Sequence, residues 1–207
     1  MRRELRVRLN AVAAEIEGSG GRSMALPVDV TDRNRVEQLF TEVVSAWGRV
    51  DILVICAGIT ADSHTVEESD PGAWEDVISV NLLEAYHCAR AAVPHMKRRG
   101  GKILTVGSGL GHKGLPGSSA YSCSKAELWM LTRVLAAELW EHNISVNELI
   151  PGPVQTGMAP DPNSGVGAIT SEWLKSPDDV VPLALFLATQ PVVGPTAQSY
   201  SLMRRDG

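Results

Sequence analysis

Several features that would assign this chain to a particular class are scarce among its 207 residues. Cysteine occurs only three times, an odd number without metal-ligand spacing, which argues against a disulfide scaffold and favours a reducing compartment. No apolar run approaches the roughly 18–20 residues that span a bilayer, and the amino terminus lacks the apolar segment of a secretory signal. The sequence therefore predicts a cytoplasmic protein without a membrane partner.

Basic charge and metal-ligand patterns are also missing. The net charge is −5, so the chain has no basic footprint and nucleic acid is not expected as a partner. The histidines lack paired metal-ligand spacing, so we predict no metal site and interpret them as surface or packing residues. They are His64, His87, His95, His112 and His142.

The composition that remains is that of a globular protein. Hydrophobic residues make up 44% of the chain and charged residues 21%, values close to the averages for folded domains. A chain of 207 residues can bury a substantial core but is too short for two ordinary domains. We therefore expect a single domain over residues 1–207.

Helical and strand patterns alternate along the chain. An apolar stripe over residues 5–16 predicts an opening helix, and a second stripe over residues 36–47 predicts another that Gly48 ends. Asp70 as N-cap and Pro71 at the first helical position begin a long helix that runs to His95. Further helices are predicted over residues 119–140 and from residue 176, after a Gly/Pro-rich connection at 157–175. Strands are predicted over residues 24–30, 50–55, 102–106 and 144–149.

This alternation predicts a parallel sheet with helices on both faces, a doubly wound α/β domain. The strand at residues 50–55 is almost continuously apolar, as expected of a central strand covered on both faces. Ligands of such folds bind at the carboxyl ends of the strands. Cys56, Ser108 and Pro151 all follow predicted strand ends, so we expect the chemistry there.

Ser108, Tyr121 and Lys125 form the most informative pattern in the chain, because a hydroxyl, a phenol and an ammonium together suit carbonyl reduction. Tyr121 and Lys125 are four residues apart and share one face of the predicted helix. A free phenol has a pKa of about 10, and lowering it to near 7 requires roughly 4 kcal/mol. An ammonium at about 4–5 Å and an effective dielectric of about 20 supplies roughly 3–4 kcal/mol. Lys125 is therefore expected to lower the pKa of Tyr121 and make it a usable acid.

These residues, with other ordered landmarks, resemble the short-chain dehydrogenase/reductase family over nearly the whole chain, most closely its 3-oxoacyl-(acyl-carrier-protein) reductases and related sugar or alcohol dehydrogenases. The resemblance implies a Rossmann-like fold, transfer of hydride between NAD(P) and a carbonyl or alcohol, and a homodimer or homotetramer. The landmarks are Asp29-Val30-Thr31-Asp32, Cys56-Ala57-Gly58, Val80-Asn81-Leu82, Ser108, Tyr121-x-x-x-Lys125, Val146-Asn147 and Pro151-Gly152-Pro153-Val154-Gln155-Thr156.

The resemblance also implies roles for single residues. Tyr121 would be the proton donor, Lys125 would bind the nicotinamide ribose, Ser108 would bind the substrate carbonyl and Asn81 would relay protons through water. The implied cofactor-binding residues are Asp29, Val30, Cys56, Ala57, Gly58, Tyr121, Lys125, Pro151, Gly152, Val154 and Thr156. Each residue also has a plain structural reading, as a turn aspartate, a helix asparagine or a loop threonine.

The chain departs from the family at both ends and in one motif. The strand, glycine-rich turn, helix and second strand with which the family begins are absent from the sequence, so the fold is expected to be N-terminally truncated, with exposed apolar strand edges. Cys56 replaces the usual asparagine. The family often binds the 2′-phosphate of NADP with basic residues at the place where Arg2 and Arg3 stand, so the resemblance implies a slight preference for NADP over NAD. The alternative to an enzyme is a non-catalytic homologue that serves as an assembly subunit or is a degenerate product.

Overall fold

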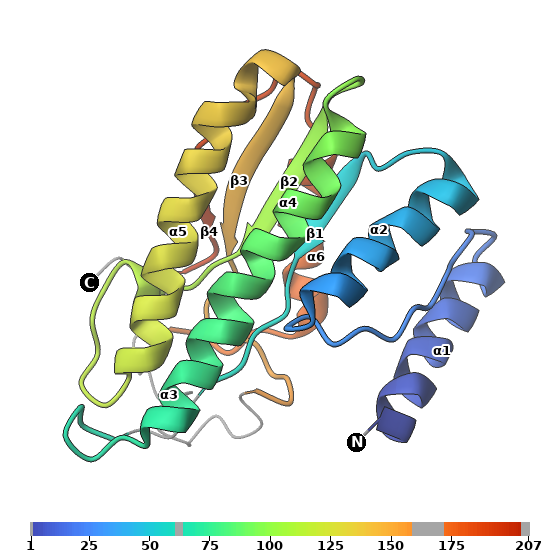
Figure 1. The fold of residues 1–207 in the computed structure, drawn as a ribbon. Coiled ribbons are helices and arrows are strands. Elements are labelled where there is room, and N and C mark those ends of the chain that lie inside the picture. Colours follow the sequence, from blue (N-terminus) through green and yellow to red (C-terminus); the bar gives the residue numbers. More distant parts are fainter. Residues whose placement is uncertain (1, 61–63, 159–171, 204–207) are drawn as a thin grey trace.

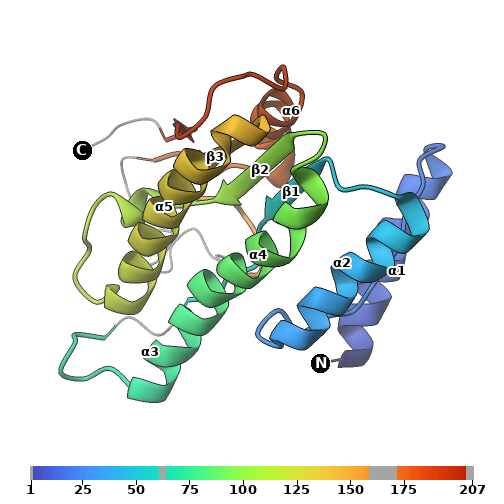
Figure 2. The same cartoon turned by 45° about the horizontal axis from the view of Figure 1, so that its top comes forward.

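The fold is a parallel four-stranded sheet with helices on both faces. The computed structural model describes the backbone of residues 2–60, 64–158 and 172–203, and the side chains within these ranges from residue 6 onward. The strands are β1 (Ile52–Ile55), β2 (Gly101–Val106), β3 (Ile144–Ile150) and β4 (Ser199–Ser201), and they pair in the order β1-β2-β3-β4. Helices α4 (Glu84–Met96) and α5 (Ser119–Leu139) cover one face and α6 (Val181–Ala188) the other (Figures 1 and 2). The predicted Rossmann-like α/β class is confirmed.

Of the two inner strands of the sheet, β2 and β3, the strand β3 has all seven of its residues buried. Its neighbours β2 and β4 pair with it in parallel, so that Thr105 and Ser199 flank Glu148 in register. The short strand β4 was not predicted from the sequence. Helix α5 (Ser119–Leu139) lies along β3, and α6 (Val181–Ala188) follows a single 3-10 turn, η4 (Pro177–Asp179).

The long helix predicted from Asp70 forms, but it contains a π-helical insertion. Helix α3 (Pro71–Ile78) is capped by the Asp70 side chain, which accepts a hydrogen bond from the Ala73 amide. The π-helix η1 (Ser79–Leu83) follows, and α4 (Glu84–Met96) continues from it. The insertion adds one residue to a turn of the helix and so changes which side chains face α5.

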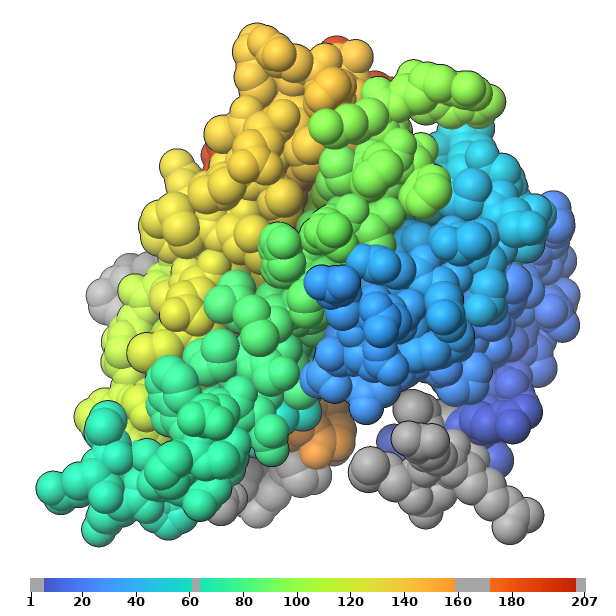
Figure 3. Space-filling model, viewed as in Figure 1, coloured from blue at the N-terminus to red at the C-terminus, as the bar shows by residue number. Residues whose placement is uncertain are grey.

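Helices α1 (Arg2–Gly18) and α2 (Arg33–Trp47) form where they are predicted. Asp32 caps α2 by accepting from the Asn34 and Arg35 amides, and Gly48, in the left-handed conformation at φ 78°, ends it. Helix α2 packs beside α4, as the space-filling view shows (Figure 3). In α1, by contrast, Val12 and Ile16 of the predicted apolar stripe remain exposed.

Two strand predictions need correction. Residues 24–30 form no strand, because no strand of the described chain lies beside them to supply backbone hydrogen bonds. The strand at 50–55 forms as β1, but at an edge of the sheet and not at its centre. Ile52 is 45% and Val54 54% exposed, so the exposed apolar edge expected from the sequence is present.

The main core lies between the sheet and the layer of α2, α4 and α5. Buried residues from all of these elements pack together there, including Phe40, Ala92, Ile103, Leu128 and Val146. A smaller cluster joins Leu104 and Leu149 to Leu187 of α6 on the opposite face. None of the described helices is long and apolar enough to cross a membrane.

Candidate active site

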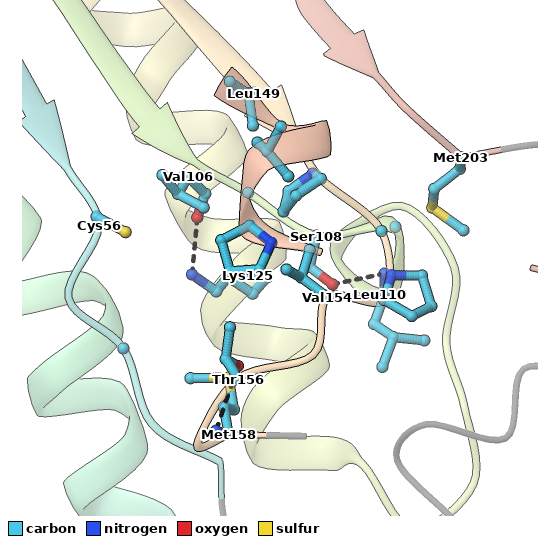
Figure 4. Close-up of a pocket in the computed structure, with 18 of the residues that line it drawn as sticks. Cys56, Val106, Ser108, Leu110, Lys125, Leu149, Val154, Thr156, Met158 and Met203 are labelled. Atoms are coloured by element: carbon cyan, nitrogen blue, oxygen red, sulfur yellow. Dashed lines mark hydrogen bonds between the residues drawn. The ribbon is translucent and has the colours of Figure 1, made fainter. Parts of the chain in front are cut away.

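A cavity of about 490 Å³ opens at the carboxyl ends of β1, β2 and β3. The segments that leave these strands form its wall (Figure 4), and α5 contributes Tyr121 and Lys125. The lining includes Cys56, Gly58, Ser108, Tyr121, Lys125, Pro151, Gly152, Val154 and Thr156. The structure therefore brings together most of the site residues predicted from the sequence, and Ala57 lies between two of them.

Lys125 extends from α5 into the protein interior and is only 4% exposed. Its Nζ donates a hydrogen bond of 2.8 Å to the Val106 carbonyl at the end of β2 (Figure 4). The same Nζ lies 5.8 Å from the centre of the Tyr121 ring. Burial lowers the pKa of Lys125, while Cys56, Glu84 and Glu148 oppose that shift by favouring the ammonium. The amine is thus held in the cavity wall, one helical turn from the phenol.

Tyr121 does not have the lowered pKa that the spacing predicted. Burial raises the pKa of its phenol, and a hydrogen bond with Ser108 only partly opposes this. The expectation overlooked desolvation, which disfavours the phenolate. It also assumed that the ammonium would approach the phenol, whereas Lys125 bonds to the Val106 carbonyl. In this structure Tyr121 is a protonated group at neutral pH.

Ser108 begins the loop between β2 and α5. Its backbone is extended, and its Oγ accepts a hydrogen bond of 3.2 Å from the Leu110 amide, which starts the 3-10 turn η2 (Gly109–Gly111). The loop turns back against α5 so closely that a methyl group at Gly111 would lie 2.7 Å from the Lys125 carbonyl carbon. This contact places Ser108 on the same wall of the cavity as Tyr121.

Asn81 lies in the π-helix η1 and is 1% exposed. Its Oδ1 accepts from the Ile59 amide at 2.8 Å, and its Nδ2 donates to the Ile59 carbonyl at 3.0 Å and to Ser124 Oγ at 2.9 Å. A methyl group at Gly58 would lie 3.3 Å from Asn81 Oδ1 and 3.7 Å from Lys125 Nζ. Asn81 therefore ties the segment after β1 to α5 beside the lysine.

Asp29 and Val30 are not brought to this cavity. The Asp29 carboxylate accepts hydrogen bonds from the Thr31 amide at 3.0 Å and from Thr31 Oγ1 at 2.7 Å, a local turn before α2. Residues 159–171, most of the predicted Gly/Pro-rich connection at 157–175, lie outside the described residues, as do the side chains of Arg2 and Arg3. Among the described side chains, no group of three or more His, Cys, Asp and Glu residues could hold a metal ion.

Two buried carboxylates near the site were missed from the sequence. Glu84 on α4 is 3% exposed and Glu148 on β3 is fully buried, and both favour the charged form of Lys125. Glu148 Oε2 accepts a hydrogen bond of 3.0 Å from His112, which was expected to be a surface or packing residue. The available signal was a single acidic residue inside an otherwise buried strand pattern.

The residues present suit one half of a dinucleotide. The cavity at the strand ends, with Tyr121 and Lys125 on one side and the Pro151–Thr156 segment on the other, fits a nicotinamide and its ribose. A glycine-rich turn that leads from a strand into a helix, the usual cradle for the pyrophosphate, does not occur in the part of the chain that the structure describes. The site therefore fits the reacting end of the cofactor.

The fold and this site define a nicotinamide-dependent α/β oxidoreductase, and comparisons with known proteins agree. The sequence model of the family described as short chain dehydrogenase matches residues 3–166. The 3-oxoacyl-[acyl-carrier-protein] reductase FabG of Thermotoga maritima is 35% identical over 187 residues, 87% of this chain and 76% of the relative. FabG of Chlamydia pneumoniae is 36% identical over 198 residues, 91% and 78% of the two chains.

Solved structures show the same likeness. A dehydrogenase/reductase from Sinorhizobium meliloti superposes with a TM-score of 0.85 and 36% identity, covering 93% of this chain and 77% of that one. ElxO with NADP bound gives a TM-score of 0.76 and 27% identity, covering 84% and 74%. The chain belongs to the short chain dehydrogenase family and is an NAD(P)-dependent oxidoreductase.

Proposed function

We propose that the chain reduces the ketone of a 3-oxoacyl thioester, with Tyr121 as the acid. The observation that carries this proposal is the gathering of Ser108, Tyr121 and Lys125 on one wall of the strand-end cavity. Apolar side chains dominate the rest of the lining, among them Leu110, Met158 and Met203, and they suit an acyl chain. The FabG relatives are named for 3-oxoacyl substrates.

Each polar residue has a distinct role in this proposal. The Ser108 hydroxyl donates a hydrogen bond to the ketone oxygen, and the Tyr121 phenol transfers its proton to that oxygen as the C–O double bond is reduced. A bound nicotinamide supplies the hydride that the ketone carbon receives. Lys125 then returns a proton to the Tyr121 phenolate and regains one from solvent, and Asn81 positions the segments on either side of Lys125.

The protonation state of Tyr121 favours reduction over oxidation at neutral pH. Because burial raises the pKa of the phenol, the proton needed by the ketone oxygen is present well above pH 7. Oxidation of an alcohol needs the phenolate as base and is favoured only at higher pH. At neutral pH the site therefore holds the proton that carbonyl reduction requires.

For the cofactor we propose NADP in preference to NAD. The proposal is supported by the pair of arginines at residues 2 and 3 and by the NADP-bound neighbour ElxO. The test is calorimetric titration of the purified chain with NADPH and NADH, followed by assays with a 3-oxoacyl thioester, a 3-oxosteroid and a simple ketone. Tighter binding of NADPH and fastest turnover of the thioester are expected. A folded chain that binds neither nucleotide would instead support the non-catalytic alternative.

We also propose that two copies associate through α4 and α5. These helices lie side by side on the outer face of the molecule (Figure 3). They carry large apolar side chains at the surface. Leu83 next to α4 is 46% exposed, Tyr86 on α4 is 47%, and Met130 and Val134 on α5 are 50% and 44%. Burial of such a patch against its own copy would give a symmetric dimer.

A further inference from the structure

Glu148 is the most deeply buried charged group near the site that the proposed chemistry does not use. Its side chain has no exposed surface, although it stands in the central strand β3 next to the cavity. A carboxylate is costly to bury unless hydrogen bonds satisfy it. The contacts of the Glu148 side chain therefore indicate which part of the site it stabilises.

Glu148 contacts both ends of the 107–112 loop, the segment that contains Ser108. At one end, its Oε1, which has no hydrogen-bond partner among the described residues, lies so close to Gly107 that a methyl group on Gly107 would overlap the carboxylate. At the other end, its Oε2 accepts a hydrogen bond of 3.0 Å from His112 Nε2. The hydroxyl of Ser199 on β4 donates a second hydrogen bond of 2.5 Å to the same oxygen. Gly107 and His112 enclose the segment that contains Ser108.

His112 is held on its other side by α5. Its ring meets the Trp129 ring edge-on, with centres 5.2 Å apart, and the guanidinium of Arg133 lies 5.4 Å from the centre of the same Trp129 ring. Arg133 in turn donates to the Ala197 carbonyl before β4. The loop is thus fastened between the sheet and the helix that carries Tyr121 and Lys125.

We propose that Glu148 and His112 are positioning residues that fix the 107–112 loop so that Ser108 stays in hydrogen-bonding range of Tyr121 and the substrate carbonyl. The buried Glu148 carboxylate has a fixed position in β3, and the hydrogen bond from the His112 ring connects the loop to it. Neither residue touches the reacting atoms. This inference rests on the proposed role of Ser108 in carbonyl reduction.

Two substitutions separate the hydrogen bond of His112 from its packing. His112→Phe keeps a ring against Trp129 but removes the donor, whereas His112→Gln keeps a donor and removes the ring. We expect His112→Phe to lower kcat about 10- to 100-fold, because a small displacement of a positioning group is enough for such a loss. The Michaelis constant and the NADPH affinity should stay within about twofold, and His112→Gln should recover most of the rate. His95→Phe, at an exposed histidine near the end of α4, is the matched control.

A double-mutant cycle with Ser108→Ala shows whether the effect passes through Ser108. His112→Phe should cost little further activity in that background. If His112→Phe lowered the activity equally in the wild-type and Ser108→Ala backgrounds, the positioning role would be overturned. The same holds if His112→Gln lost activity and His112→Phe did not. Either result would leave the proposed reaction intact. If Ser108→Ala itself changes nothing, the proposed role of Ser108 fails instead.

Amide hydrogen exchange tests the loop independently of turnover. The peptide over residues 107–112 should exchange faster in His112→Phe than in the wild-type chain and His112→Gln. The reason is that the Leu110 and Gly111 amides lie in the 3-10 turn, which the hydrogen bond from His112 to Glu148 stabilises. Unchanged exchange in His112→Phe would contradict the inference. Faster exchange in a chain that reduces no carbonyl would retain the inference about the loop and reject the proposed function.

Discussion

Lys125 places an ammonium group where water is largely excluded, and its neighbours explain how the charge is tolerated. The Val106 carbonyl accepts a hydrogen bond from it, and the carboxylates of Glu84 and Glu148 favour its charged form. Burial opposes them and lowers the pKa of the amine. A lysine in this balance can give up and regain a proton near the phenol of Tyr121, which a fully solvated lysine does less readily.

The hydrogen bond between Ser108 and Tyr121 leads to a prediction about pH. Reduction requires the protonated phenol, so its rate should fall as pH rises through the pKa of Tyr121, which burial raises. The Ser108 hydroxyl favours the phenolate and lowers this pKa. Ser108→Ala should therefore shift the alkaline limb of the kcat/KM profile to higher pH. It should also reduce the rate about 100-fold, because a donor to the carbonyl oxygen is lost. A limb that moves to lower pH would contradict this account.

At the scale of elements, the sequence predicted what depends on local spacing. Tyr121 and Lys125 share a face of α5 because they are four residues apart, and Asp70 caps α3 because its side chain reaches the Ala73 amide. Residues 24–30 have the composition of a strand, but a strand also needs a neighbour, which composition does not reveal. The approach of Glu148 to Gly107 and His112 depends on how β3 and the loop pack, so spacing could not predict it.

The π-helix η1 could not be predicted from the sequence either, because the insertion of one residue into a helical turn does not change the composition or the apolar pattern enough to be recognised. Its effect is to bury Asn81 with three hydrogen bonds to Ile59 and Ser124. Asn81→Ala would leave the Ile59 groups and Ser124 without this partner. We expect a loss of about 2–3 kcal/mol in the free energy of unfolding. Urea titration followed by circular dichroism measures this.

Asn10→Ala provides the control for this experiment, because Asn10 is exposed on α1 and alanine favours helix. The urea concentration at which half of this variant is unfolded should differ from the wild-type value by no more than a few tenths of a molar. If Asn81→Ala unfolded at the same urea concentration as Asn10→Ala, the hydrogen bonds at η1 would not stabilise the fold.

At the scale of the whole molecule, large apolar side chains remain exposed at several places. One is the edge strand β1, where Ile52 and Val54 are exposed, and another is α6, where Leu185 and Phe186 are exposed. A third is the face of α4 and α5 proposed to join two copies. Exposed apolar area of this extent is a typical mark of surfaces that other chains or segments cover.

Met130→Glu tests the proposed dimer surface on α4 and α5. A carboxylate at this position on α5 would be buried without a partner in the proposed dimer, so association should weaken by at least about tenfold. Sedimentation velocity across a concentration series measures the change, and Arg8→Glu on the exposed face of α1 is the control. A wild-type chain that sediments as a monomer at all concentrations would reject the proposed dimer.

The central claim is that Tyr121 supplies the proton for carbonyl reduction by this chain, and Tyr121→Phe tests it most directly. NADPH consumption with a 3-oxoacyl thioester should fall at least about 100-fold in this variant, since general acid catalysis contributes that much. The circular dichroism spectrum and the NADPH affinity should match those of the wild-type chain. Turnover retained in a folded, NADPH-binding Tyr121→Phe chain would contradict the account.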